Sequence, residues 1–282
     1  MTDLRPRTGL TDAESVAVRE VVDAASRADG VAPVSEQTLL RLTRPGGEWT
    51  LAYVDGEAAG LAFVEDGGGE LVVHPRFRRH GVGSALLGGL ADDVAIWAHG
   101  RLPAAEAFAA RHSYVVDRVL LKMHRSLAEP LPDASFPAGI TVRTFVPGQD
   151  EAAWLEVNRR AFSHHPEQGS WTREDLQDRE EQPWFDPAGF FLAVEDGALR
   201  GFHWTKTHDE TTGEIFVLAV DPAAQGRRLG PALAVAGLQY LHDRGLTDAI
   251  LYVEESQSGA VRLYERLGFT RASVDVQFRR AL

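Results

Sequence analysis

The sequence has no cysteine. This absence excludes a disulfide framework, a metal site built on cysteine and a thiol nucleophile. The sequence also has no apolar run that approaches the ~20 residues needed to cross a membrane. The charged segment from Met1 to Arg7 is not followed by the apolar stretch of a secretory signal peptide. We therefore expect a cytoplasmic protein with no membrane partner.

Basic residues are also in short supply, with 29 Lys and Arg against 41 Asp and Glu and a net charge of −12. A protein that binds a nucleic-acid backbone needs a basic face, so this balance argues against general nucleic-acid binding. Any anionic ligand must then be held by a local group of arginines.

The 282 residues, 44% of them hydrophobic, are enough for two domains of about 140 residues each. We expect a monomer.

One strand-loop-helix segment organises the rest of the chain. The apolar, β-branched stretch from Glu214 to Val220 is expected to form a strand and residues 231–240 a helix, with the turn Gln225-Gly-Arg-Arg-Leu-Gly230 between them. Unpaired N–H groups at the helix start, the helix dipole and two arginines make this turn an anion site that suits a pyrophosphate. It is not a Walker loop, because no Lys-Ser/Thr follows the glycine, and its glycine spacing is not that of a dinucleotide fingerprint.

The same segment occurs twice. Val73-His74-Pro75 matches Val220-Asp221-Pro222 at a separation of 147 residues, which places Gly83 on Gly230. Asp55-Gly56 matches Asp196-Gly197, each between two expected strands, and residues 105–114 match 260–269 at a separation of 155. Residues 128–137 contain three prolines and are the expected linker. The chain is therefore two copies of one α/β unit.

The expected elements follow from hydrophobic periodicity and turn signals. In the first copy we expect helices at residues 11–28, 35–42 and 84–94 and strands at 49–54 and 59–65. In the second copy we expect a hairpin of strands at 190–195 and 199–208 before the segment described above.

The repeated loop resembles the Gln/Arg-x-x-Gly-x-Gly/Ala loop of the GNAT superfamily of N-acetyltransferases, which holds the pyrophosphate of the co-substrate acetyl-CoA. The resemblance implies an α/β fold of two tandem GNAT acetyltransferase domains, each a mixed, mostly antiparallel sheet flanked by helices. We place these domains at residues 1–137 and 138–282. One departure is Arg228, where the pattern has glycine. We expect it to be tolerated on the assumption that the backbone there is already helical.

The resemblance also implies which residues contact acetyl-CoA. The last helix starts with Gln257-Ser258-Gly259-Ala260, similar to the family's Asn-x-x-Ala with glutamine in place of asparagine. In the C-terminal copy the expected contacts are Leu218, Ala219, Val220, Gln225, Gly226, Arg227, Arg228, Leu229, Gly230, Pro231, Gln257, Ser258, Gly259, Ala260, Val261 and Arg262. In the N-terminal copy they are Leu71, Val72, Val73, Arg79, His80, Gly81, Val82, Gly83 and Ser84.

The two copies differ where chemistry would be done. An amine that attacks a thioester must lose a proton, and the departing thiolate must gain one. In the C-terminal copy Glu214 opens the strand before the loop, and Tyr264 stands where the superfamily often carries a tyrosine near the sulfur. Their counterparts in the N-terminal copy are Gly67 and Ala109. We expect the C-terminal domain to be catalytic and the N-terminal domain to bind acetyl-CoA without contributing chemistry.

Residues 165–171, 201–207 and 251–255 resemble those of the mycothiol synthase family, tandem GNAT enzymes that acetylate the cysteinyl amine of cysteinyl-glucosaminyl-inositol. This resemblance implies substrate contacts from Glu167, Lys206, Glu214 and Tyr252, and from Glu36 in the N-terminal half. Glu36 as a plain surface carboxylate stays an open alternative.

Two other functions stay open from the residues themselves. One is acetylation of an antibiotic, a polyamine or a protein N-terminus, and the other is a non-catalytic sensor that binds acetyl-CoA. We expect no metal, because His164, His165, His203 and His208 have no partners at ligand spacing.

Overall fold

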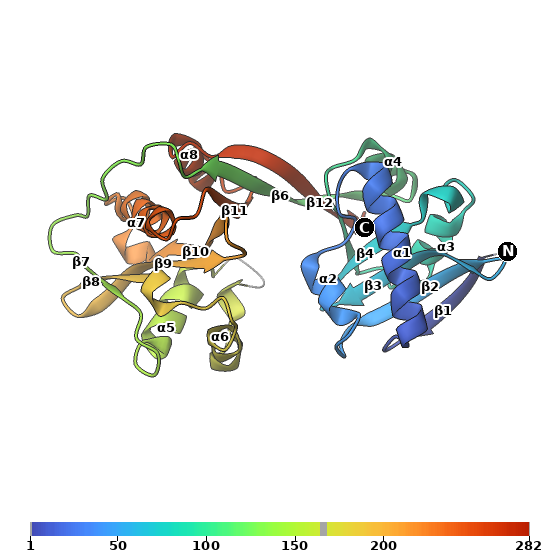
Figure 1. The fold of residues 1–282 in the computed structure, drawn as a ribbon, viewed down its shortest axis with the longest axis horizontal. Helices are drawn as coiled ribbons and strands as arrows, with labels where there is room; N and C mark the ends of the chain where they lie inside the picture. Colours follow the sequence, from blue (N-terminus) through green and yellow to red (C-terminus); the bar gives the residue numbers. More distant parts are fainter. Residues whose placement is uncertain (1, 164–167, 282) are drawn as a thin grey trace. The chain divides into compact units, whose positions relative to one another are not determined.

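The computed structural model describes residues 2–163 and 168–281, which form two compact units. The N-terminal unit contains the chain up to Leu121, Glu254–Ser256 and the end of the chain from Ser273. The C-terminal unit contains Lys122–Val253 and Gln257–Ala272. In each unit helices cover paired strands, so the expected α/β class is confirmed (Figure 1). Within the described ranges no helix has the length and apolar character to cross a membrane.

The N-terminal unit is built from ten elements and parts of two long strands that it shares with the other unit. In chain order they are β1 (Thr2–Arg7), α1 (Asp12–Asp29), α2 (Glu36–Arg41), β2 (Glu48–Val54), β3 (Glu57–Glu65), β4 (Gly68–Val73), the 3₁₀ helix η1 (Pro75–Phe77), α3 (Val82–Gly88), β5 (Ala95–Ala98), α4 (Pro103–Arg111), and parts of β6 (Tyr114–Ser126) and β12 (Thr270–Arg280). The strand order is β1-β2-β3-β4-β5-β12-β6. Strands β1 to β4 pair antiparallel, whereas β4 and β5 run parallel.

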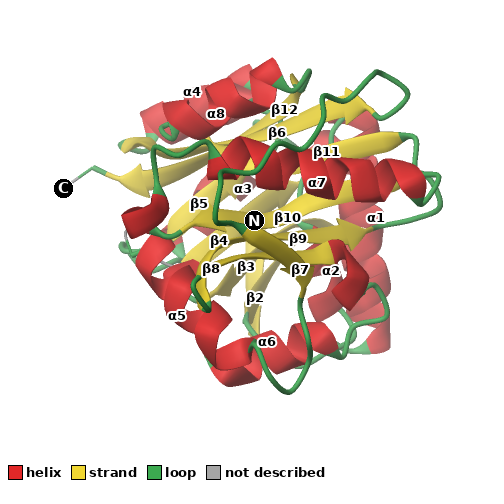
Figure 2. Cartoon of the chain, turned by 90° about the vertical axis from the view of Figure 1, so that its left-hand side faces the viewer, coloured by secondary structure: helices red, strands yellow, loops and turns green. Residues whose placement is uncertain are grey.

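The C-terminal unit repeats this plan. Its elements are β7 (Thr141–Thr144), α5 (Glu151–Ala161), η2 (Gln168–Ser170), α6 (Arg173–Glu180), η3 (Pro187–Gly189), β8 (Phe190–Glu195), β9 (Ala198–Thr207), β10 (Thr212–Val220), η4 (Pro222–Ala224), α7 (Leu229–Asp243), β11 (Asp248–Glu254) and α8 (Ser258–Arg266). The strand order is β6-β11-β10-β9-β8-β7, with β10 and β11 parallel. Helix α7 packs on β9 and β10 (Figure 2).

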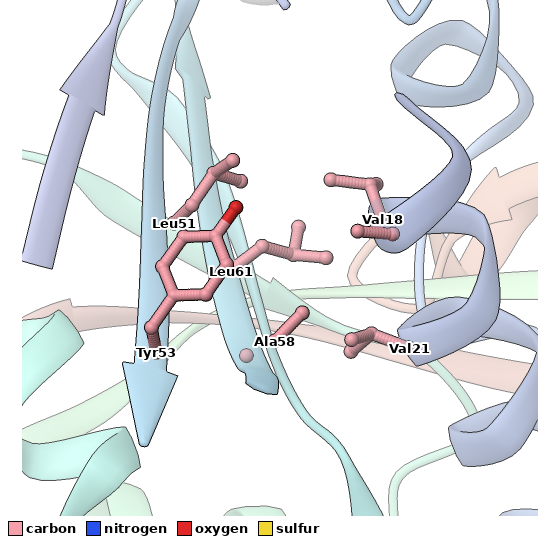
Figure 3. A pocket seen from close by; sticks show the side chains of 8 residues that line it. Val18, Val21, Leu51, Tyr53, Ala58 and Leu61 are labelled. Atoms are coloured by element: carbon pink, nitrogen blue, oxygen red, sulfur yellow. The ribbon is translucent and has the colours of Figure 1, made fainter. Parts of the chain in front are cut away.

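The core of the N-terminal unit lies between α1 and the sheet. Val18 and Val21 of the helix face Leu51 and Leu61 of β2 and β3 (Figure 3), because apolar residues recur every three or four positions along α1. The void left among these side chains is about 10 Å³, at most room for one water molecule. The helix is therefore packed closely against the strands that precede the loop.

The core of the C-terminal unit is aromatic. Phe190 stacks on both Phe145 and Trp204, with ring centroids 4.4 and 4.5 Å apart. Trp154 and Phe216 meet Trp204 edge-on at 5.9 and 5.3 Å. Stacked and edge-on contacts of this kind add stability beyond the burial of the rings. They fix β8, β9 and β10 relative to one another.

The two units repeat the same elements at the predicted separations. The β2–β3 and β8–β9 hairpins turn at Asp55-Gly56 and Asp196-Gly197, and each has one bulge. Helices α4 and α8 have nine residues each and start 155 positions apart, and η1 and η4 start 147 apart. The predicted tandem repeat is confirmed. The expected helix at residues 84–94 is wrong in extent: α3 ends at Gly88, because two successive glycines favour termination there.

The last strand of the chain completes the N-terminal unit. Strand β12 pairs antiparallel with β5 through Val276↔Ala98, Gln277↔Trp97 and Phe278↔Ile96, although its first residues, Thr270–Ala272, belong to the C-terminal unit. Strand β6 is divided between the units in the same way, after Leu121. Compact units and sequence repeats need not divide at the same residue. The expected domains, residues 1–137 and 138–282, stay a prediction.

Gly237 of α7 makes room for a buried histidine. His203 of β9 is fully enclosed and donates its Nδ1 hydrogen to the carbonyl oxygen of Leu233 at 2.7 Å, and burial lowers the pKa of His203 to about 4. A Cβ at position 237 would lie 2.0 Å from His203 Cε1. The glycine therefore allows the neutral imidazole to fit under the helix.

We predict that Gly237→Ala lowers the free energy of unfolding by about 1–3 kcal/mol, because the added methyl group overpacks the core. Gly88→Ala is the control: it is a helical glycine where an added Cβ has no neighbour within 4 Å. This change should raise the free energy of unfolding by up to ~1 kcal/mol through better helix propensity. Denaturant titration measures both. A Gly237→Ala protein as stable as the parent would mean that the imidazole can move aside.

Candidate functional site

In both units the two parallel strands separate after a few residues. Strands β4 and β5 are paired only from Gly68↔Ala95 to Glu70↔Trp97, and β10 and β11 only from Thr212↔Asp248 to Ile215↔Leu251. The rest of β4 and β10 continues to pair with β3 and β9 on the other side. Backbone N–H and C=O groups of residues 71–73 and 216–220 are therefore open to an extended ligand along one edge.

The loop after each of these strands contains two residues in the left-handed conformation. They are Arg79 (φ 67°) and Gly81 (φ 84°) in the N-terminal loop, and Gly226 (φ 79°) and Arg228 (φ 62°) in the C-terminal loop. Turns of this kind direct successive N–H groups toward one concave side, where an anion can bind.

The expectation that Arg228 is already helical is wrong. Arg228 is the left-handed N-cap of α7, a conformation that costs a side-chain-bearing residue roughly 1–2 kcal/mol. In the N-terminal loop the corresponding residue before α3 is Gly81, which adopts the same conformation without that cost. The departure from the family pattern is therefore a strained position and not a neutral one.

A cavity of about 680 Å³ lies beside the N-terminal loop. Its lining includes seven of the predicted contacts: Leu71, Val72, Val73, Arg79, Gly81, Gly83 and Ser84. Trp97, His99 and Phe108 also line it. This volume is in the range of small-molecule sites. Of the two remaining predicted contacts, His80 is exposed and Val82 is buried in the core.

Each loop carries an arginine that is paired with a carboxylate. Both terminal nitrogens of Arg78 donate to Asp29 at 2.7 Å. Arg227 donates to the two oxygens of Glu195 at 2.9 and 2.7 Å. Bidentate pairs of this type are strong, so a phosphate that binds Arg227 has to compete with Glu195.

Glu214 lies one residue before the point at which β10 and β11 separate, and its side chain is 8% exposed. Its Oε2 is 2.6 Å from Nε2 of His208. Its partner across the hairpin is Lys206, whose ammonium lies 5.0 Å from the centre of the Trp184 ring. A carboxylate in this position can accept a proton from an amine that enters between the strands.

The other predicted substrate contacts lie in different elements. Tyr252 is exposed on β11 and directly follows the last residue paired with β10. Glu36 is exposed in the first turn of α2, in the N-terminal unit. Glu167, like His164 and His165, lies outside the described residues. The structure thus brings Lys206 beside Glu214 and places Tyr252 on the neighbouring strand.

Tyr264 is buried on α8, edge-on to Phe269 with ring centroids 5.9 Å apart. Burial raises the pKa of its phenol to about 12, so it keeps its proton at neutral pH. At the start of the same helix Gln257, Ser258 and Gly259 are exposed. In the part of the chain that the structure describes, no group of three His, Asp or Glu side chains is arranged to hold a metal.

The N-terminal counterpart of Glu214 differs from the one expected. The pairing of β9 and β10 shifts at Phe216, where β10 has a bulge. Glu214 lies opposite Lys206, and Gly68 lies opposite Glu65 at the same place in the other hairpin. The structural counterpart of Glu214 is therefore Gly68 and not Gly67. Both candidates are glycine, so this position has no carboxylate in either alignment.

Sequence reasoning missed a buried charged cluster in the N-terminal unit. Glu70 Oε1 is 2.8 Å from Nε2 of His99 and accepts the N–H of Ser35 at 2.8 Å, and Nδ1 of His99 is 3.1 Å from Asp275 of β12. Burial acts to lower the pKa of His99, but the bonds and charges of Asp275 and Glu70 raise it to about 9. The charged imidazole joins β12 to β4. The signal in the sequence was a lone carboxylate in an otherwise apolar strand.

The model of the Acetyltransferase (GNAT) family matches residues 18–113 and 152–269. A GCN5-related N-acetyltransferase from Sphaerobacter thermophilus is similar in structure, with a TM-score of 0.76 and 30% identity over 98% of this chain and 94% of that chain. A tandem GNAT protein from the clavulanic acid biosynthesis pathway shares the fold, with a TM-score of 0.70 and 20% identity over 99% and 98% of the two chains. Fold and loops together define a tandem acetyltransferase of the GNAT class.

Curated relatives narrow this class. The mycothiol acetyltransferase of Thermomonospora curvata is 52% identical over 281 residues, which cover 96% of this chain and 95% of the relative. That of Thermobispora bispora is 50% identical over 286 residues, with 96% and 97% covered. The chain belongs to the mycothiol acetyltransferase family, and the resemblance inferred from the sequence is confirmed. The roles of individual residues stay predictions.

The His99 cluster predicts a pH dependence of stability. The folded pKa of about 9 lies above the ordinary value of 6.5, so the stabilisation is complete below pH 6.5 and is lost as the pH rises through 9. We expect the free energy of unfolding to fall by about 3 kcal/mol across this window, and His99→Gln to remove that contribution. Denaturant titrations at several pH values measure it, with the exposed His80→Gln as control. An equal slope in His99→Gln and the parent would contradict the assignment.

Proposed function

We propose that this protein transfers the acetyl group of acetyl-CoA to the cysteinyl amine of 1D-myo-inositol 2-(L-cysteinylamino)-2-deoxy-glucopyranoside, giving mycothiol and CoA. The observation that carries the proposal is the position of Glu214. A buried carboxylate stands where β10 and β11 separate, in a chain 52% identical to a named mycothiol acetyltransferase. The expectation of a cytoplasmic monomer stays a prediction.

In this proposal Glu214 is the general base. The substrate arrives as an ammonium ion, which pairs with the carboxylate and then gives up a proton to it. The neutral nitrogen attacks the thioester carbon, and the C–S bond breaks as the thiolate of CoA leaves. The nitrogen gives up its second proton as the amide forms, which balances the proton that the thiolate takes up. The Lys206 ammonium, held over the Trp184 and Phe216 rings, adds a fixed positive charge beside the carboxylate.

Tyr264 is the proposed proton donor to the departing thiolate. Its protonated, buried phenol is suited to this role, because burial holds the proton in place until an anion develops nearby. A thiolate leaves tolerably well without protonation, so this contribution to the rate should be smaller than that of the base.

The N-terminal unit is proposed to bind acetyl-CoA in its 680 Å³ cavity without transferring the acetyl group. Gly68 and Ala109 stand where the C-terminal unit has Glu214 and Tyr264. The nearby carboxylate, Glu70, already accepts hydrogen bonds from Ser35 and His99. A base that is already paired in this way is poorly placed to take a proton from a substrate.

Glu214→Gln keeps the size and reach of the side chain but cannot take a proton, so we predict a loss of roughly 10²–10⁴ in acetyl transfer. Both kcat and KM should change, because the carboxylate also pairs with the ammonium. Raising the pH should partly restore the rate, since more amine then arrives neutral. Tyr264→Phe should have the smaller defect and no alkaline rescue. Near-normal turnover of Glu214→Gln at neutral pH would exclude it as the base.

The assay is release of CoA thiol across an amine panel that includes cysteinyl-glucosaminyl-inositol, a polyamine, an aminoglycoside and a peptide N-terminus. The proposed function requires release with the first of these. Release with another amine alone would identify a different acetyltransferase. Binding of acetyl-CoA with no release for any amine would identify a sensor.

The loops predict separate effects on binding and turnover. Arg227→Ala should weaken acetyl-CoA binding about tenfold to a hundredfold, through loss of a charge-assisted phosphate contact. Glu195→Gln should strengthen binding, because it removes the carboxylate that competes for Arg227. Arg79→Ala should remove at most one of two binding sites and leave turnover nearly intact. Calorimetry measures the first two effects and, with the thiol assay, the third.

Arg228 allows charge and backbone to be separated. Arg228→Ala and Arg228→Gly both remove the charge and should weaken acetyl-CoA binding to a similar degree. Only glycine relieves the left-handed backbone, so the glycine variant should be the more stable of the two by about 1 kcal/mol. Unchanged affinity in all of the Arg227 and Arg228 variants would mean that the pyrophosphate binds elsewhere.

A further inference from the structure

The proposed base is poorly connected to water. The Glu214 side chain is 8% exposed, whereas that of His208, whose Nε2 lies 2.6 Å from Glu214 Oε2, is 26% exposed. A buried carboxylate that takes a proton in every turnover must also release it. The imidazole links the enclosed carboxylate to solvent.

We propose that His208 is a positioning residue for Glu214 and passes on the proton that Glu214 takes from the substrate. The proposal rests on the acetyl transfer proposed above. An N–H bond of the substrate ammonium breaks and an O–H bond forms on Glu214. Before reaction the Nε2–H of His208 donates to the ionised carboxylate. Once Glu214 is protonated, the imidazole exchanges its hydrogen from Nε2 to Nδ1 through water, and the proton on Glu214 then moves to Nε2, which restores the carboxylate. The imidazolium loses its Nδ1 proton to water, which restores the neutral imidazole with its hydrogen on Nε2.

The turn that carries His208 is held in a fixed shape. The backbone N–H of His208 donates to the carbonyl oxygen of Thr212 at 2.9 Å. Asp209 Oδ1 accepts the N–H groups of Thr211 and Thr212 and the hydroxyl of Thr211, each at 2.8 Å. These bonds lower the pKa of Asp209 to about 2, so it stays ionised and the turn stays closed at any pH used for the assay. A fixed turn sets the imidazole against the carboxylate.

The N-terminal unit supplies an internal comparison. There the matched residues Glu65 and Gly68 are separated only by the tight turn Asp66-Gly67, whereas Lys206 and Glu214 are separated by seven residues. The longer connection in the C-terminal unit is the segment that contains His208. The unit without a carboxylate at this position therefore also lacks the segment that would bring a histidine to it.

Other charged groups lie near the pair and bear on any pH profile. Lys206 is opposite Glu214 on β9, and Asp209 is in the turn itself. On β11, Asp248 is the register partner of Thr212, and its Oδ1 is 2.6 Å from Nε2 of His124 on β6. The His124–Asp248 pair has the same contact distance as the His208–Glu214 pair. It is therefore a matched control in the same unit.

The test compares His208→Ala, Glu214→Gln and the double variant in the full-length protein. We expect His208→Ala to lower kcat about 10- to 100-fold with the KM for acetyl-CoA unchanged, and added imidazole to restore part of the rate. The double variant should be no slower than Glu214→Gln, because His208 acts through the carboxylate. His208→Gln, which keeps a donor but carries no proton, should retain more activity than His208→Ala. His124→Ala should keep normal turnover.

Different results would overturn the role of His208 and the proposed acetyl transfer. Full turnover of His208→Ala beside an impaired Glu214→Gln, or independent losses that multiply in the double variant, would overturn the role of His208 alone. If the parent protein acetylated no amine, the proposed function would fail. The pair would then be tested by an NMR titration of the His208 imidazole. A lower pKa in Glu214→Gln than in the parent supports the pair, and an unchanged titration overturns it.

Discussion

The site depends on two parallel strands that pair briefly and then separate. Parallel pairing lasts through Ile215↔Leu251 in one unit and Glu70↔Trp97 in the other, and beyond it one edge of β10 and of β4 has backbone groups to satisfy. In the C-terminal unit the bulge at Phe216 follows immediately, and bulges bend the strand that carries them. The opening beside the proposed base, Glu214, begins at this departure from regular pairing.

Duplication has kept this frame and changed its chemistry. The hairpins, the 3₁₀ turns and helices α4 and α8 recur in the same order in the two units. The differences at the site include a longer β9–β10 connection, Glu214 in place of Gly68, and Tyr264 in place of Ala109. The N-terminal unit uses its buried carboxylate instead in an ion pair with His99. The same fold therefore carries the proposed proton-transfer groups in one copy and a structural ion pair in the other.

The features that could be predicted from the sequence are those set by residues close together along the chain. The repeat, the hairpins, the loops and the candidate base all follow from residue type and spacing over a few tens of positions. The misassigned backbone of Arg228 shows the limit of such reasoning, because a left-handed residue is set by the turn around it and not by its own preference. The His99 cluster was missed for another reason. Asp275 reaches it from β12, about 176 positions along the chain, and a contact between residues so far apart leaves no local pattern in the sequence.

Strand β12 gives the N-terminal unit a role that needs no ligand. The strand begins at Thr270, four residues after α8, the helix that carries Tyr264, and it ends in the N-terminal unit, paired with β5. There Asp275 is held by His99, which Glu70 holds in turn. Without β5, one edge of β12 would expose unpaired N–H and C=O groups. The N-terminal unit thus fixes the segment that follows α8, and this role depends on strand pairing and an ion pair and not on proton-transfer groups.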